Sequence, residues 1–361
     1  MIAIIGAGPV GCYAASLLAD EHEVVVFEEH KSVGLPVQCT GIVTQEIFRF
    51  VPKKNDFVIN KTDKVRIFAP NNKCINLRLE KPDIIIDRQK FDNYFYKQAK
   101  SKGVKFLFNH KFVSAGFSDL WVKDLKTKKI KRVKCSCVIG ADGPLSAVAK
   151  NTDLYNKRKF FIGLQAIIKK KNSNMIDFYP LKQGFGWAVP EDRGTLRVGV
   201  ASRTNPKEQF ENLLKRYKGK IIAKQGGLIP VFNPWAKFRK EKVYLIGDAG
   251  GFVKATTGGG IIPGLKSAEV VAHSIKHNLG YDAGIYLHLL PNLWLHLKMR
   301  EVMDSFTEKD WNELVKDLNE KDSKKILQRV NRDNLFQLLL NTAINNPKIM
   351  KYGLKYFKTL F

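Results

Sequence analysis

The hydrophobic pattern at the start of the chain consists of short apolar runs separated by glycine and by a helical pattern. Residues 2–5 are all apolar, and the segment Gly6-Ala7-Gly8-Pro9-Val10-Gly11 follows them directly. A helical pattern runs from Cys12 to about Ala19, and the next apolar run, Val24 to Phe27, ends at Glu28. The order of strand, glycine turn, helix, strand and acidic residue predicts a parallel α/β unit that binds a dinucleotide.

The glycines of this segment have separate physical roles. Gly6 permits a tight turn, Gly8 lets the backbone approach a pyrophosphate, and Gly11 lets the helix pack closely on the strand. The N–H groups at the start of the helix then face the phosphates. Glu28 is placed to accept a hydrogen bond from a ribose hydroxyl. The motif predicts a dinucleotide but does not by itself separate FAD from NAD.

Two later segments favour FAD. An apolar strand runs into the Asp-Gly turn at Asp142, and a second strand ends at Gly247-Asp248. The run Gly258-Gly259-Gly260-Ile261 then opens another helix. A second glycine-lined helix N-terminus suits a cofactor that is too long for one phosphate loop. Asp248 is expected to bind a ribityl hydroxyl, and the N–H groups near Gly260 are expected to face the flavin or the pyrophosphate.

The pattern changes in the middle and at the end of the chain. Alternating or apolar strands with turns, such as Ile162 to Ile168 and Thr195 to Val200, predict an antiparallel sheet inserted into the nucleotide domain. From about residue 280 the pattern is helical, as in Ile285 to Met299. The predicted division is an FAD-binding domain at 1–60, 81–157 and 241–280, a substrate-binding domain at 61–80 and 158–240, and a C-terminal helical region at 281–361.

Composition is that of a globular protein with room for two interleaved domains. The chain has 361 residues, of which 44% are hydrophobic and 26% are charged. No uninterrupted apolar run reaches the roughly 18 residues of a membrane span. Met1 leads straight into the first strand, so no signal peptide is expected. We therefore expect a cytoplasmic protein, either free or peripheral on the inner face of the cell membrane.

The formal net charge of +27 favours anionic partners. No nucleic-acid recognition motif with interleaved aromatic residues is present, so nucleic acid is not expected. An anionic membrane surface is one candidate, because a basic helix around Tyr352 to Phe361 interleaves Lys with Leu, Tyr and Phe. The alternative is that the lysines are spread over all faces of the molecule and serve no particular partner.

The five cysteines predict neither a disulfide framework nor a metal site. Their number is odd, and no spaced pairs recur along the chain. Cys135 and Cys137 form a single C-x-C that is best explained as structural. No cysteine follows Cys137, so a C-terminal iron–sulfur cluster is excluded.

The three nucleotide segments, at Gly6 to Glu28, around Asp142 and at Gly247 to Ile261, resemble in this order the para-hydroxybenzoate-hydroxylase-like group of flavoproteins. Within that group, three blocks of the sequence resemble the geranylgeranyl reductase family. Residues 34–41 (GLPVQCTG) look like the family segment that lies beside the isoalloxazine. Residues 178–190 (FYPLKQGFGWAVP) resemble its substrate-cavity motif, with Phe185 and Val189 where the motif has Tyr and Phe. Residues 247–261 (GDAGGFVKATTGGGI) are close to its flavin-binding run.

The resemblance implies a Rossmann-type FAD-binding domain with an inserted antiparallel-sheet substrate domain and a C-terminal helical region. It also places the site residues. The substrate contacts would be Tyr179, Phe185, Trp187 and Pro190. The FAD contacts would be Gly6, Gly8, Pro9, Gly11, Glu28, Gln38, Cys39, Gly41, Arg88, Phe112, Asp142, Gly247, Asp248, Gly259, Gly260 and Ile261.

The implied reaction is the saturation of C=C bonds of geranylgeranyl chains in membrane diether lipids or their precursors. Reduced FAD would deliver hydride from N5 to one carbon, and a proton must reach the other carbon in a dry apolar cavity. Cys39 is the candidate for assisting that proton delivery or positioning the substrate, and its alternative role is that of a small buried packing residue. The electron donor would be NAD(P)H or a ferredoxin.

Other uses of the fold stay open. A flavin-dependent monooxygenase or halogenase shares it, although the first Trp of the halogenase W-x-W-x-I-P motif is missing before Trp187. A non-redox FAD-containing protein that binds or isomerises prenyl lipids is a further alternative.

Overall fold

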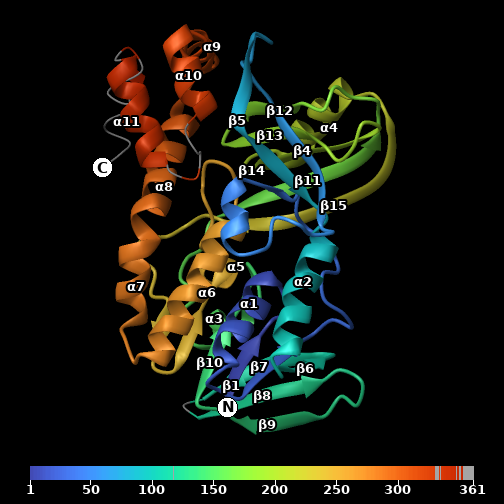
Figure 1. Cartoon of the computed structure of the whole chain (residues 1–361), viewed down its shortest axis with the longest axis vertical. Coiled ribbons are helices and arrows are strands. Elements are labelled where there is room, and N and C mark those ends of the chain that lie inside the picture. The colour runs from blue at the N-terminus through green and yellow to red at the C-terminus, as the bar shows by residue number, and fades with distance from the viewer. Residues whose placement is uncertain (117, 330–332, 334, 347, 349–350, 353–361) are drawn as a thin grey trace.

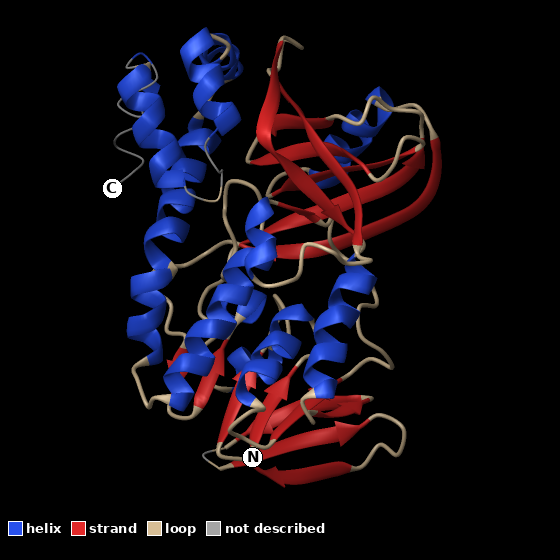
Figure 2. Ribbon diagram, in the orientation of Figure 1, coloured by secondary structure: helices blue, strands red, loops and turns tan. Residues whose placement is uncertain are grey.

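A computed structural model describes residues 1–116, 118–329, 333, 335–346, 348 and 351–352. Two groups of strands lie at opposite ends of the molecule, with helices between them (Figure 2). The helices that follow residue 280 run along one side of both groups (Figure 1). This arrangement confirms a mixed α/β fold with parallel and antiparallel sheets and a helical C-terminal region.

The nucleotide-binding part is built on a six-stranded sheet that is parallel except at one edge. Its order is β16 (Arg239–Lys240), β17 (Val243–Leu245), β10 (Cys137–Gly140), β1 (Ile2–Ile5), β2 (Val24–Glu28), β6 (Lys105–Phe108). Because strands alternate their side chains, the two faces have separate cores. Ile2 and Ile4 pack under the helices, whereas Ala3 and Ile5 pack on a small three-stranded sheet.

The helices of this part are α1 (Pro9–Leu18), α2 (Arg88–Ser101), α3 (Ala147–Asn151), α5 (Gly247–Gly250) and α6 (Ile261–Lys276), with the 3-10 helix η1 (Gln45–Arg49) nearby. The three-stranded sheet consists of β7 (His110–Ala115), β8 (Asp119–Asp124) and β9 (Ile130–Lys134).

The inserted part is built on an eight-stranded sheet. Its order is β15 (Lys220–Pro230), β11 (Phe160–Lys169), β14 (Thr195–Ser202), β13 (Gly184–Pro190), β12 (Ile176–Leu181), β4 (Val58–Phe68), β5 (Cys74–Ile86), β3 (Ile42–Val43). All pairs are antiparallel except β12 with β4. The helix α4 (Pro206–Arg216) packs on one face of this sheet. Strand β4 begins before residue 61 and strand β5 ends after residue 80, so this sheet includes residues outside the predicted segment 61–80.

The C-terminal region contains α7 (Tyr281–His288), α8 (Leu290–Ser305), α9 (Glu308–Leu318), α10 (Lys321–Arg329) and α11 (Leu335–Asn345). The helical stretch predicted from Ile285 to Met299 is therefore two helices, which break at Leu289 because Pro291 begins a new helix. Most of the basic helix predicted around Tyr352 to Phe361 lies outside the described residues. Lys351 is described, and it pairs with Asp317 at 2.8 Å.

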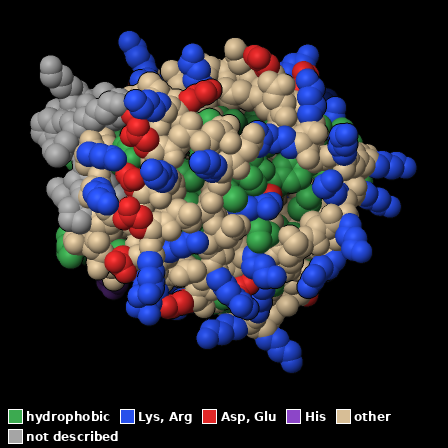
Figure 3. Space-filling model, turned by 90° about the horizontal axis from the view of Figure 1, so that it is seen from above, with side chains coloured by type: hydrophobic (Ala, Val, Ile, Leu, Met, Phe, Trp, Pro, Cys, Tyr) green, Lys and Arg blue, Asp and Glu red, His purple; other side chains and the backbone are tan. Residues whose placement is uncertain are grey.

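Positive side chains are numerous on the face of the molecule that Figure 3 shows. These Lys and Arg side chains are spread around a central group of hydrophobic side chains. Within the described part of the chain, no helix combines the length and the apolar character that crossing a membrane requires.

Candidate active site

The first glycine loop places the N-terminus of α1 at the end of β1. Gly6 has φ of +103°, and a Cβ on Gly6 would stand 2.4 Å from the Ala141 carbonyl oxygen. A Cβ on Gly11 would stand 2.2 Å from the carbonyl oxygen of Gly6. Both positions therefore need glycine because backbone approaches backbone. Around Gly8, in contrast, no described heavy atom lies within 4 Å of a Cβ position, so the loop faces open space there.

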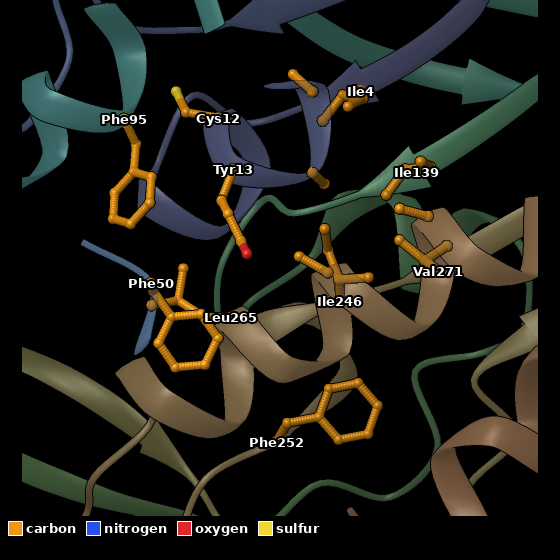
Figure 4. Packing of buried hydrophobic residues seen from close by; sticks show 14 of the residues in the cluster. Ile4, Cys12, Tyr13, Phe50, Phe95, Ile139, Ile246, Phe252, Leu265 and Val271 are labelled. Carbon is orange, nitrogen blue, oxygen red and sulfur yellow. The ribbon is translucent and has the colours of Figure 1, made fainter. Parts of the chain in front are cut away.

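A second helix N-terminus lies against the first. A Cβ on Gly264, in the first turn of α6, would stand 2.8 Å from Val10 Cγ2, in the first turn of α1. Gly247 also packs on Val10. Behind this contact, Tyr13 of α1 and Leu265 of α6 belong to one buried cluster (Figure 4). Close glycine packing thus brings the two N-termini together.

These N-termini fit the pyrophosphate of a dinucleotide. Gly8 is the N-cap of α1 and Gly260 is the N-cap of α6, and no side chain among the described residues caps either helix. The first N–H groups of both helices therefore lack intrahelical partners and carry the positive end of the helix dipole. An anion at this position would satisfy them.

Two carboxylates predicted to contact FAD differ in what surrounds them. Both oxygens of Asp142 already accept hydrogen bonds, from Ser146 Oγ at 2.6 Å and from the Val148 N–H at 3.0 Å, so Asp142 orders the turn into α3. Asp248 Oδ1 lies 2.8 Å from the Cβ position of Gly260, so a side chain at residue 260 would displace this carboxylate. Burial raises the pKa of Asp248, and the charges of Arg88 and Arg158 oppose that rise.

Glu28 lies at the carboxyl end of β2 and closes the first loop. Its carboxylate accepts the Ala7 N–H at 2.8 Å and the His30 N–H at 2.9 Å. A carboxylate has capacity for further donors, so a ribose hydroxyl remains compatible with this geometry. Phe112 lies in β7, and its side chain is buried on the opposite side of the β1–β2 sheet from the helices.

The segment from Gln38 to Gly41 is held by the inserted sheet. The buried Arg197 donates from Nη1 to the Thr40 carbonyl oxygen at 2.5 Å and to that of Ile86 at 3.1 Å. The Thr40 hydroxyl donates to Gln165 Oε1 at 2.7 Å. Neither Arg197 nor Gln165 is among the residues predicted from the sequence. The feature that could have pointed to them is a polar residue at a buried position of an otherwise apolar strand.

Cys39 lies at the junction of both parts of the molecule. Its Sγ accepts the Gly41 N–H at 3.3 Å and neighbours the guanidinium of Arg88. Arg88 also pairs with the buried Asp92 at 3.1 Å. Burial lowers the pKa of Arg88, but Asp92 and Cys39 outweigh burial, so the net pKa is raised. A permanent positive charge therefore stands beside the sulfur.

The sheet face next to this junction is aromatic. Phe185 and Trp187 of β13 belong to one cluster, with ring centroids 5.9 Å apart, and Phe161 and Phe178 join them. The indole N–H of Trp187 donates to Gln165 Oε1 at 2.9 Å. The Cζ of Phe185 lies 3.1 Å from the Cβ position of Gly258. The substrate motif and the glycine run before α6 are therefore in contact.

Tyr179 and Pro190, which are also predicted substrate contacts, lie on the other face of the sheet from Phe185 and Trp187. Tyr179 packs under α4, where its ring stacks on Phe68 and its hydroxyl bonds Tyr217 at 2.5 Å. Pro190 is paired with Leu196 of that same α4-side cluster. The reason is the alternation of side chains along a strand and its register with the neighbouring strand.

One surface hollow of the described chain lies away from the predicted site residues. It is on the outer side of α2 and is lined by Asp56, Gln89, Lys90, Asn93, Tyr94 and Lys97. Among the described residues, no three His, Cys, Asp or Glu side chains are grouped to hold a metal ion. All five cysteines are free thiols.

Comparison with known proteins agrees with this geometry. Residues 1–160 match the family model of an FAD binding domain. Digeranylgeranylglycerophospholipid reductase 3 of Methanosphaera stadtmanae is 27% identical over 354 residues, covering 87% of this chain and 89% of the relative. The digeranylgeranylglycerophospholipid reductase of Methanococcus vannielii is 25% identical over 403 residues, covering 99% and 97%.

Solved structures share the fold. A geranylgeranyl bacteriochlorophyll reductase-like protein from Thermoplasma acidophilum superposes with a TM-score of 0.83 at 21% identity and covers 99% of this chain and 98% of its own. The flavin-dependent halogenase CmlS reaches a TM-score of 0.67 at 15% identity, covering 97% and 71%. The chain thus has an FAD-binding domain and is similar, over most of its length, to proteins named digeranylgeranylglycerophospholipid reductase, which agrees with the resemblance carried by its three motif blocks.

Proposed function

We propose that this protein is an FAD-dependent oxidoreductase acting on CH–CH bonds, which saturates C=C bonds of geranylgeranyl chains in membrane diether lipids or their precursors. The observation that carries the proposal is the similarity, over nearly the whole chain, to proteins named digeranylgeranylglycerophospholipid reductase. Halogenases share the fold at lower identity and lower TM-score, so their chemistry is the weaker candidate.

The chain supplies a binding frame for the cofactor. The N–H groups of α1 and α6 hold the pyrophosphate, with Glu28 at a ribose and Asp248 at the ribityl chain. The Cys39 segment and Arg88 border the place where the nucleotide part meets the inserted sheet. When bound, FAD supplies the two electrons of the reduction as hydride.

Cys39 is the proposed proton source. An isolated alkene has no carbonyl group to polarise, so the proton must come from a group held close to the receiving carbon. The thiol carries a transferable proton, and the guanidinium of Arg88 stands beside it. The Gly41 N–H, which bonds the same sulfur, holds it in place.

The aromatic face formed by Phe161, Phe178, Phe185 and Trp187 is the proposed contact surface of the prenyl chain. These side chains provide apolar area and exclude water from the reacting bond. The hydrogen bond from Trp187 to Gln165 fixes the indole orientation. Gln165 also bonds Thr40, so this face and the Cys39 segment are held in one arrangement.

The source of electrons and the location of the substrate suggest two partners. NAD(P)H or a ferredoxin reduces the flavin, and the net charge of +27 suits an acidic ferredoxin. The same charge suits peripheral contact with an anionic membrane that contains the lipid substrate.

Anaerobic turnover tests the proposed reaction. The flavin is reduced with dithionite, and a geranylgeranyl diether lipid is added. Reoxidation of the flavin together with a mass gain of two hydrogens per bond in the lipid supports the reductase. Reoxidation only by oxygen, with a hydroxylated product, identifies a monooxygenase. Lipid binding or isomerisation without flavin reoxidation identifies the non-redox alternative.

A further inference from the structure

Three charged side chains gather where α8 meets the inserted sheet, and the proposed reaction does not use them. Arg300 Nε lies 2.9 Å from Asp304 Oδ1, one turn further along α8. Arg203, just after β14, donates from Nη2 to the other carboxylate oxygen of Asp304. Arg300 is 2% exposed, and the Asp304 side chain is 9% exposed. This cluster is a buried site with two guanidinium groups and one carboxylate.

The cluster has more positive than negative charge. No carboxylate except Asp304 acts on the pKa of Arg300 in the described structure, and burial lowers that pKa. All Asp and Glu residues of the sequence are among the described residues, so none outside them can supply the missing charge. Glu301, the other acidic residue of this helical turn, pairs with Lys298 at 2.9 Å. The buried Arg300 and Asp304 balance each other, so the excess positive charge belongs to the partly exposed Arg203, where a bound anion would balance it.

The guanidinium groups also have unused donors. The Nη2 of Arg300 and the Nε of Arg203 are buried and have no hydrogen-bond partner among the described residues. The Nη1 of Arg300 reaches only the Gly184 carbonyl oxygen, at 3.4 Å. Buried N–H groups are normally paired, so these donors are available to an acceptor that binds from outside the chain.

A line of aromatic rings connects this cluster to the glycine run of the cofactor site. The guanidinium carbon of Arg203 stands 5.6 Å from the ring centroid of Phe161. The Phe161 and Phe185 centroids are 6.0 Å apart, and Phe185 contacts the backbone at Gly258. The apolar face therefore ends at a positive group on the side away from the glycine run.

We propose that Arg203, with Arg300 behind it, binds the phosphate group of the prenyl substrate. The inference rests on the proposed function, since it names a group of the same substrate. A molecule with an apolar chain and an anionic end matches a surface with aromatic rings and a cationic end. The side chain of Arg203 is 29% exposed, so Arg203 is the member that contacts the phosphate. Its planar fork suits phosphate oxygens.

The phosphate can belong to a glycerophospholipid or to a free prenyl diphosphate. Three substrates distinguish these two sources of phosphate from a site that needs no phosphate. They are a geranylgeranyl glycerophosphate diether, the same diether with a free hydroxyl in place of the phosphate, and geranylgeranyl diphosphate. The test variants are Arg203→Gln, which removes the charge, and Arg203→Lys, which keeps the charge but loses the fork. The control is Arg216→Gln, because Arg216 also lies over an aromatic ring, that of Tyr179, but on the α4 side of the sheet.

We expect wild type to show a KM at least about tenfold lower for phosphorylated than for neutral lipid. Arg203→Gln should abolish that preference by raising the KM for the phosphorylated lipid to that for the neutral lipid. Arg203→Lys should retain part of the preference, and Arg216→Gln should retain all of it. A preference for the diphosphate alone would assign the site to a free prenyl diphosphate. Equal KM values for phosphorylated and neutral substrates in wild type, or equal losses in Arg203→Gln, would overturn the proposal.

A binding measurement separates this proposal from the proposed reaction. Saturated diether phosphate and saturated neutral diether, in neutral detergent micelles, are titrated into the FAD-loaded wild type and variants. Weaker binding of the phosphate alone by Arg203→Gln supports the anion site even if no lipid reoxidises the flavin. If lipids are reduced but Arg203→Gln binds both diethers as wild type does, the anion site is wrong and the reductase stands.

Discussion

Gly8 and Gly11 belong to one motif, but Gly8 borders open space whereas Gly11 is closely packed. Substitution of each glycine therefore tests whether the phosphates of FAD bind at this loop. A Cβ on Gly11 would collide with the Gly6 carbonyl oxygen at 2.2 Å, whereas a Cβ on Gly8 would enter open space. Gly8 also has φ of −67°, which alanine adopts without strain. We expect Gly8→Ala to leave the Tm of the FAD-free protein unchanged but to weaken FAD binding by about tenfold or more, since the methyl group takes the place of the phosphates.

Gly11→Ala is the matched comparison. It should lower the Tm of the FAD-free protein as well as the FAD affinity, because helix and strand must separate to make room. Thermal unfolding without FAD and titration of flavin fluorescence measure the two quantities. An FAD affinity for Gly8→Ala equal to that of wild type would contradict the placement of the phosphates at this loop.

Cys39 gives a second test at this scale. In Cys39→Ala the proton source is removed, while the glycine loops are untouched. FAD should stay bound, and the rate of lipid-dependent flavin reoxidation should fall by about 10²-fold or more, as for loss of a general acid. Cys74→Ala is the control, since Cys74 is a partly exposed thiol at the start of β5. Full turnover by Cys39→Ala would reduce Cys39 to a packing residue.

Some residues of the site could be predicted from the sequence, and others could not, for physical reasons. Gly6, Gly11 and Gly260 stand at a tight turn or a close contact where a side chain would collide with its neighbours. Such glycines can be recognised because they form short motifs in the sequence. Gln165 and Arg197 bond Thr40, which is 125 and 157 positions away, so no pattern in their own strands indicates their partners.

The sheet face of Tyr179 cannot be predicted from the sequence for a related reason. A motif match gives a position along the chain, but the side of the sheet depends on the register between β12 and β13. Tyr179 pairs with Gly186, whereas Phe178 pairs with Trp187. Phe178 is therefore the residue of β12 that shares the aromatic face, and only the paired structure reveals it.

At the scale of elements, the first strands and helices agree closely with the sequence pattern. The strand at residues 2–5 and the strand ending at Glu28 are as predicted, because buried parallel strands appear as continuous apolar runs. The break between α7 and α8 was missed, although Pro291 marks it. Leucine and histidine occur on both sides of the proline, so the apolar content conceals the boundary.

A contact that includes a titratable group joins helix α8 to residues 252–260, the loop between α5 and α6 that we call the cofactor loop. His296 Nδ1 lies 2.6 Å from Thr256 Oγ1. Burial, followed by the charge of Lys254, lowers the pKa of His296 to about 3. Unfolded histidine titrates near pH 6.5, so between about pH 3 and 6.5 the unfolded chain holds a proton that the folded protein lacks. The unfolding free energy should therefore fall as the pH drops below about 6.5, by at most about 1.4 kcal/mol per pH unit from this residue.

His296→Gln removes this titration while keeping a hydrogen-bonding side chain beside Thr256. The difference in unfolding free energy between wild type and variant should be constant above about pH 7 and should shrink between about pH 6.5 and 5. Urea denaturation at three pH values in this range measures it. The same difference at every pH would show that His296 titrates normally in the folded protein.

At the scale of the whole molecule, a buried ion pair joins three distant parts of the chain. Lys254, between α5 and the glycine run, pairs with Asp333 of the C-terminal region, and Asp333 also accepts the hydroxyl of Thr44. Lys254 Nζ and its backbone both lie against Gly259. The C-terminal helices thus support the cofactor loop directly. The sequence could not reveal this support, because a lysine in a glycine-rich loop has no local sign of burial.

The C-terminal helices also display an apolar stripe. In α11, Phe336 is 66% exposed, Leu340 is 47% exposed and Ile344 is 66% exposed. Their spacing of four residues places them on one face of the helix. On a molecule of net charge +27, an exposed apolar stripe suits the interface of an anionic membrane. This feature supports peripheral contact with the membrane that would contain the lipid substrate.

Vesicle co-sedimentation tests this contact. Binding should require anionic lipid and should weaken as salt rises from about 0.1 M to 1 M, where the screening length falls from about 10 Å to about 3 Å. The double variant Leu340→Gln/Ile344→Gln should bind less at every salt concentration, because burial of a Leu or Ile side chain contributes about 1.5–3 kcal/mol. Ile222→Gln is the control, since Ile222 is 53% exposed on β15. Equal binding to neutral and anionic vesicles would remove the electrostatic part of the argument, and unchanged binding by the double variant would remove the role of α11.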